Sequence, residues 1–73
     1  MVKIILNNGN EYIANLEMNE LLDILKHSEE QFFTVDTLCF LSENKPYFID
    51  GKPVFNEYKI AVNKDFISEY SIY

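Results

Sequence analysis

The chain has 73 residues, enough for one domain with a thin core, since a domain of this size buries only about 60% of the surface that its unfolded chain exposes. Hydrophobic residues make up 48% of the chain, which is too many for a disordered segment. Twelve acidic residues against six basic ones, all lysine, give a net charge of -6, and this excess argues against direct binding of nucleic acid.

The chain also lacks the features of a membrane or secreted protein. No apolar run approaches the length of about 20 residues that crosses a membrane, and no basic segment followed by an apolar run opens the chain. A single cysteine, Cys39, excludes an internal disulfide framework. We expect a cytoplasmic protein, without membrane association, that forms a single α+β domain over residues 1–73.

The chain begins with a predicted hairpin, MVKIILNNGNEYIANL, in which two β-rich runs flank Asn8-Gly9. A two-residue loop would pair Leu6 with Glu11. A three-residue loop at residues 8–10 is favoured because it puts an apolar set on one face: Val2, Ile4, Leu6, Tyr12 and Ala14.

An amphipathic helix is predicted next, within NLEMNELLDILKHSEE. Its apolar residues recur at the spacing of one helical face: Met18, Leu21, Leu22 and Leu25. Asn15 and Asn19 are both candidate N-caps, and the acidic residues that follow suit the positive end of the helix dipole. Lys26 and His27 suit the other end.

The segment after the helix predicts further strands. Residues 32–41 read as one long strand or as two short strands broken near Asp36. Asp50-Gly51 is a strong hairpin turn, which would pair Phe48 with Pro53 in a pair without ladder hydrogen bonds.

The two Lys-Pro pairs, at 45–46 and 52–53, are explained by this geometry. Pro46 would be the first residue of its strand, a place that tolerates proline. We therefore interpret ENKPYFIDGKPVF as two turns of a sheet rather than as a recognition loop.

The last third of the chain predicts one alternating strand, in which Tyr58, Ile60 and Val62 share a face. A helical turn capped by Asn63 follows, and then an extended segment closes or edges the sheet. That segment would place three apolar residues on one face: Phe66, Tyr70 and Ile72. The predicted fold is an antiparallel sheet of five or six short strands with one amphipathic helix after the first hairpin, and a partly closed small barrel is a variant.

Residues suited to catalysis are few. His27 is explained by its place at the helix end, and Cys39 stands among apolar residues with no cationic neighbour. Both glycines are assigned to turns, so no phosphate-binding loop is present, and no metal motif occurs. We expect no enzyme activity, no cofactor and no metal.

The first stretch, MVKIILNNGNEYIANLEMNELLDILK, with its strand, Asn-Gly turn, strand and Glu-Leu-Leu helix, resembles small accessory proteins of phages and mobile elements of low-GC Gram-positive bacteria. The resemblance covers roughly the first third of the chain, points to no specific family and carries over no functional residues. It implies a compact protein that binds and modulates a host protein.

Aromatic residues point to surface recognition, because five Tyr and six Phe exceed what a thin core easily buries. The leading hypothesis is a non-enzymatic protein-binding module, a phage-encoded inhibitor or modulator of a host protein. Its candidate binding residues are Glu17, Glu20, Asp23, Glu29, Glu30, Tyr47 and Phe48. If the glutamate and aspartate side chains among them mimic phosphates, the partner would be a nucleic-acid-binding protein. The alternative hypothesis is a self-associating structural subunit of a larger assembly, with a homodimer as its unit.

Overall fold

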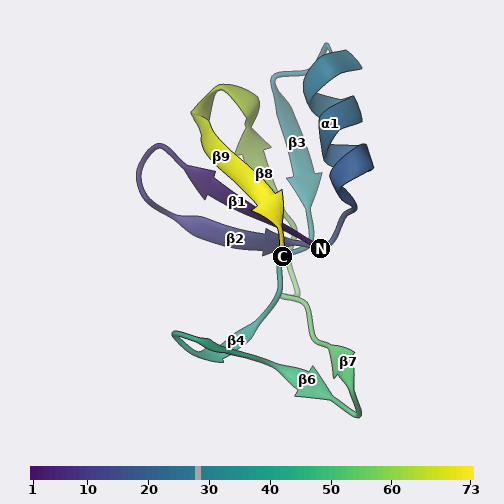
Figure 1. Cartoon of the computed structure of the whole chain (residues 1–73), viewed down its shortest axis with the longest axis vertical. Helices are drawn as coiled ribbons and strands as arrows, with labels where there is room; N and C mark the ends of the chain where they lie inside the picture. The colour runs from purple at the N-terminus through teal and green to yellow at the C-terminus, as the bar shows by residue number, and fades with distance from the viewer. Residues whose placement is uncertain (28) are drawn as a thin grey trace.

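Two parts make up the molecule, a body and a β arm that projects from it (Figure 1). The computed structural model describes residues 1–27 and 29–73, and its extents are 38 × 23 × 22 Å. The body contains β1 (Val2–Leu6), β2 (Glu11–Ala14), α1 (Met18–His27), β3 (Phe32–Val35), β8 (Ile60–Asn63), the 3-10 turn η1 (Lys64–Phe66) and β9 (Ile67–Ile72). The arm contains β4 (Phe40–Ser42), β5 (Lys45–Pro46), β6 (Phe48–Ile49) and β7 (Lys52–Pro53).

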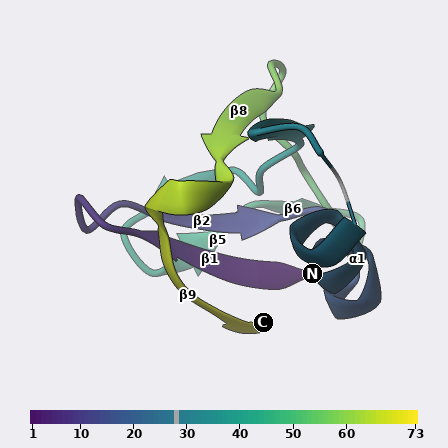
Figure 2. The ribbon, with the colours of Figure 1, turned by 90° about the horizontal axis from the view of Figure 1, so that it is seen from above.

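A three-stranded antiparallel sheet with the order β2-β1-β9 is the largest sheet of the body. Val2 of the central strand pairs with Ala14 on one side and with Ile72 on the other. β3 and β8 form a separate antiparallel pair, in which Phe33 lies opposite Val62. Seen from above, β8 turns away from this sheet, and α1 lies beside the start of β1 (Figure 2).

The first hairpin has a three-residue loop, as predicted, but the loop is residues 7–9 rather than 8–10. Leu6 donates its N–H to the carbonyl of Asn10 at 2.9 Å, and Gly9 donates to the carbonyl of Leu6 at 2.9 Å. Gly9, with a φ of +89°, takes the left-handed position that such a loop requires. Ile4 therefore pairs with Tyr12 rather than with Ala14, a shift that leaves every side chain on its predicted face.

The core lies between the three-stranded sheet, α1 and the β3-β8 pair. Its buried residues are Val2, Ile4, Ala14, Leu16, Leu21, Val35 and Val62. The predicted apolar face of the helix is confirmed at three of its four residues, because Leu21 is fully buried and Met18 and Leu25 pack against the cluster, whereas Leu22 is half-buried. No helix within residues 1–27 or 29–73 is long and apolar enough to cross a membrane.

The helix begins directly after Glu17, which is its N-cap residue. The first helical hydrogen bond runs from the Leu21 N–H to the Glu17 carbonyl at 3.1 Å. Glu20 Oε1 accepts a hydrogen bond from the Glu17 N–H at 3.1 Å, which is one of the two bonds of a capping box. The prediction of Asn15 or Asn19 as N-cap is therefore wrong, since Asn15 lies ahead of the cap position and Asn19 lies within the first turn.

The prediction of one sheet with five or six strands is wrong. The described strands form one three-stranded sheet and three two-stranded ones. The strand ends before Asp36, which agrees with the second of the two predicted alternatives, and isolated bridges then link Ala14 to Thr37 and Leu38 to Phe55. These single bridges do not close a barrel among the described residues, because β4 to β7 leave the body and pair with one another in the arm.

Two short hairpins build the arm. β6 and β7 pair through Phe48 opposite Pro53, as predicted. Their turn is Asp50-Gly51, with φ angles of +51° and +77°, which is the conformation that two-residue hairpin loops favour. Pro46 lies opposite Phe40 at the end of β5, so the prediction that it begins its strand is wrong, because the turn after β4 folds residues 45–46 back onto that strand.

The segment after β8 follows the prediction at its start. Asn63 caps η1, and its Oδ1 accepts the N–H of Asp65 at 3.0 Å. β9 then continues extended and pairs with β1, so the chain end forms the edge of the sheet.

Two details of the C-terminal prediction are wrong. Tyr58 lies outside β8 and is 78% exposed, because the chain bends at residues 57–58 before the strand starts. Phe66 lies in η1 and does not share a strand face with Tyr70 and Ile72.

Candidate functional site

A triangle of backbone hydrogen bonds joins the three passes of the chain at the base of the arm. Tyr47 donates to the carbonyl of Cys39 at 2.9 Å, Cys39 donates to the carbonyl of Val54 at 2.9 Å, and Val54 donates to the carbonyl of Tyr47 at 3.0 Å. Each residue comes from a different pass of the chain through the arm base. The triangle therefore satisfies three backbone N–H groups and three backbone carbonyls where the ladders of the arm stop.

A side-chain network supports the same junction. Thr37 is 3% exposed, and its Oγ1 accepts a hydrogen bond from Nδ2 of Asn56 at 2.8 Å. The Cys39 thiol donates to Oδ1 of Asn56 at 3.0 Å. The backbone N–H of Asn56 also donates to the carbonyl of Thr37 at 2.8 Å. One amide side chain thus ties two residues of the outgoing strand to the returning strand.

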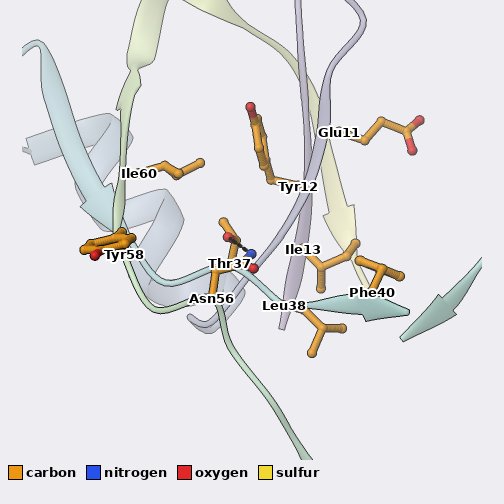
Figure 3. A pocket seen from close by; sticks show the side chains of 9 residues that line it. All are labelled: Glu11, Tyr12, Ile13, Thr37, Leu38, Phe40, Asn56, Tyr58 and Ile60. Atoms are coloured by element: carbon orange, nitrogen blue, oxygen red, sulfur yellow. Dashed lines mark hydrogen bonds between the residues drawn. The ribbon is translucent and has the colours of Figure 1, made fainter. Parts of the chain in front are cut away.

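A groove lies where the arm leaves the body, along the outer side of β2. Three adjoining hollows share the same lining residues, Glu11, Ile13 and Phe40. The first hollow extends past Tyr12 to Tyr58, the second extends along the arm, and the third lies between the arm and two residues of the body, Lys3 and Tyr73. Figure 3 shows these side chains around the Thr37–Asn56 hydrogen bond.

The floor of the groove is apolar. Ile13 and Leu38 are 5% and 3% exposed, whereas Phe40 at the arm side is 43% exposed. The first hollow holds about 320 Å³ and is also lined by Tyr12, Tyr58, Ile60, Thr37 and Asn56. Tyrosine offers an apolar ring and a polar hydroxyl, which suits a surface whose rim is exposed to solvent and whose floor is buried.

The rim of the groove carries more negative than positive charge. Glu11 and Glu43 face one lysine, Lys3, which also lines the groove. Lys3 Nζ lies 3.7 Å from Glu11 Oε2, and both side chains are more than a third exposed. An exposed pair of this kind contributes at most about 1 kcal/mol, so both groups can exchange partners readily.

The predicted acidic residues all lie on the surface: Glu17, Glu20, Asp23, Glu29 and Glu30. Glu20 bonds the helix start, and Asp23 Oδ1 lies 3.7 Å from His27 Nε2. Figure 1 places α1 and the arm at opposite ends of the molecule. The structure therefore does not bring these acids together with the predicted aromatic residues of the meander.

The two predicted aromatic residues are both in or beside the arm. Tyr47 is half-buried at the arm base, where its backbone takes part in the triangle. Phe48 is 47% exposed on β6 and does not line the groove. They support or flank the concave surface rather than forming its floor.

The groove residues that the sequence reading missed are Tyr12, Ile13, Phe40 and Tyr58. A signal for Ile13 was present, because it shares the outward face of the hairpin with Lys3 and Glu11, where an isoleucine is out of place. Phe40 and Tyr58 carried no comparable signal, because their position depends on how the arm turns away from the body.

Groups that could bind a metal ion do not gather in the part of the chain that the structure describes. No cluster of three or more His, Cys, Asp or Glu side chains there could hold a metal ion. Cys39 is half-buried, which agrees with its predicted apolar setting, and His27 is exposed at the end of α1.

Comparison of the chain with protein-family models, with curated proteins and with solved structures gave no match. The resemblance to phage accessory proteins stays a prediction. The shape and chemistry of the groove are therefore the observations on which a function can rest.

Proposed function

We propose that this protein is a non-catalytic protein-binding module that holds an extended segment of its partner in the groove between β2 and the arm. The observation that carries the proposal is the continuity of the three hollows, which share Glu11, Ile13 and Phe40. Concave surfaces with an apolar floor and a few polar groups are the usual sites of ligand and peptide binding.

Backbone groups along β2 favour an extended segment. Leu6 and Asn10 form a hydrogen-bonded pair, so the alternation of an antiparallel ladder turns the N–H and C=O of Glu11 away from β1. Farther along, the outward carbonyl of Ile13 is already used, because it accepts the N–H of Leu38 at 2.8 Å. A partner strand can add to the open portion of this edge at Glu11, as in β-augmentation.

The charge of the protein favours a segment with apolar anchors flanked by lysine or arginine. The net charge is -6, and the groove rim carries Glu11 and Glu43 against Lys3. A basic partner would be steered toward this surface, and its binding would weaken as salt rises. The resemblance to phage accessory proteins supports a host protein as the partner, whose activity the binding inhibits or modulates.

A selection from a displayed library of random peptides tests the proposal. We expect enriched peptides to combine an aromatic or aliphatic anchor with basic neighbours. For such a peptide, Phe40→Ser should weaken binding at least about tenfold in fluorescence anisotropy, because exposed aromatic anchors concentrate binding energy. Phe32→Ser is the matched control, since Phe32 is 55% exposed on β3 and does not line the groove.

The helix acids provide the competing surface. Asp23→Lys should change the affinity less than Phe40→Ser, because Asp23 lies on α1, away from the groove. If Asp23→Lys abolished peptide binding and Phe40→Ser left it intact, the binding surface would be the acidic helix face, and the groove proposal would be lost.

A further inference from the structure

The C-terminal part of β9 is left uncovered by the body on its core side, whereas Ile67 at its start packs against the core. Tyr70 and Ile72 lie opposite Ile4 and Val2 and so point to the same face of the sheet. Ile4 and Val2 are 1% and 0% exposed, whereas Tyr70 and Ile72 are 41% and 76% exposed. The apolar face of the sheet thus extends beyond the layer that covers it.

The same strand has an open edge. Within residues 1–27 and 29–73, β9 pairs with β1 alone, and Figure 2 shows no further strand beyond it. Because the Tyr73 N–H bonds the Met1 carbonyl at 3.1 Å, alternation of the ladder turns the N–H and C=O groups of Tyr70 and Ile72 outward. The strand, ISEYSI, contains neither lysine nor proline, the residues that commonly protect such edges.

We propose that β9 pairs antiparallel with β9 of a second copy of this chain, around a two-fold axis at Ser71. The outward N–H and C=O groups of Tyr70 would then form hydrogen bonds with those of the partner's Ile72. The two-fold symmetry gives the same pair between Ile72 and the partner's Tyr70. The pairing would join the two three-stranded sheets into one continuous sheet.

Side-chain chemistry selects this register. Tyr70 lies beside the partner's Ile72, so the two uncovered apolar residues of each copy cover those of the other. Ser71 lies opposite its own copy, and Glu69 lies opposite the partner's Tyr73. A register centred on Glu69 would instead place two carboxylates opposite each other, which destabilises a sheet.

A second copy suits this edge better than a foreign strand because it supplies every complement at once. It brings outward backbone groups at the same spacing, an isoleucine for the tyrosine, and no like charge directly opposite Glu69. Most of the groove between β2 and the arm lies at the opposite edge of the sheet, although Tyr73, which lines one of its hollows, also takes part in the proposed contact. Failure of this inference therefore leaves the groove proposal intact.

Sedimentation across a concentration series tests the dimer. We expect mostly dimer at about 100 µM and mostly monomer at about 1 µM, as for a small interface of micromolar affinity. Ile72→Lys should raise the dissociation constant at least about tenfold, and Phe32→Lys, on another exposed strand, should leave it unchanged. A wild-type protein that stays monomeric at about 100 µM overturns the inference.

Cysteine cross-linking tests the register in the Cys39→Ser background. Across the proposed axis the Cα atoms at position 71 lie about 4.5 Å apart, within the range that a disulfide bridges. With diamide as oxidant, Ser71→Cys should yield a covalent dimer. Glu69→Cys should not, because its two copies lie about 13 Å apart along the strands. Cross-linking of Glu69→Cys as readily as Ser71→Cys overturns the register.

Discussion

Tyr47 donates its backbone N–H to the carbonyl of Cys39 at 2.9 Å, and this bond attaches the arm to the strand that leaves the body. No residue of the arm belongs to the buried core cluster. The position of the arm therefore depends on this polar junction and on the buried side chains of Ile13 and Leu38 beside it, and so does the groove beside Phe40.

Asn56→Ala tests the junction. The substitution removes two side-chain hydrogen bonds and leaves Oγ1 of the buried Thr37 without its partner. We expect the free energy of unfolding in urea to fall by about 1–3 kcal/mol. Asn7→Ala, at an exposed position of the first loop, is the control and should change it by less than about 0.5 kcal/mol. Equal effects of the two substitutions would contradict the role of Asn56.

Gly51→Ala tests whether the arm opens independently of the body. Gly51 has a φ of +77°, where an alanine side chain costs about 1–2 kcal/mol. We expect hydrogen exchange of the Val54 amide to accelerate about tenfold, while amides of β1 keep their protection. Gly51→Asn should have a smaller effect, because asparagine tolerates this conformation. Equal acceleration in β1 would show that arm and body unfold together.

Leu21→Ala tests the core beneath α1. Leu21 is fully buried, so its truncation should lower the free energy of unfolding by about 2–5 kcal/mol. Leu41→Ala makes the same chemical change at a residue that is 58% exposed on β4, and it should cost less than about 0.5 kcal/mol. A chemical denaturation series on both variants measures the difference. Similar values would mean that the packing of α1 described above is incorrect.

Glu20 has a structural role that its exposure conceals. Its Oε1 accepts the N–H of Glu17, so Glu20→Ala should lower the free energy of unfolding by about 0.5–1 kcal/mol. Glu20→Gln keeps an acceptor at the same place and should retain most of that free energy. Thermal unfolding of both variants separates the effect of the capping bond from that of the charge. A larger loss of stability in Glu20→Gln than in Glu20→Ala would refute the capping role of Glu20.

Local features of this fold could be predicted from the sequence. The apolar helix face at Leu21, the hairpin turn at Asp50-Gly51, the cap at Asn63 and the break at Asp36 are all present. Each depends on side-chain and backbone preferences within a few residues, such as positive φ at glycine or an asparagine oxygen that bonds a nearby N–H. The residues that determine each of these features therefore lie in the same short segment of the sequence.

Only the tertiary structure decided which strand edges meet. The departure of the arm from the body, the burial of Ile13 on the outward face of the hairpin and the exposure of Ile72 on the core face of β9 depend on contacts between distant segments. Alternation along a strand assigns a side chain to a face, but it does not say what covers that face. The groove and the open β9 edge arise from these distant contacts, so neither could be read from the sequence.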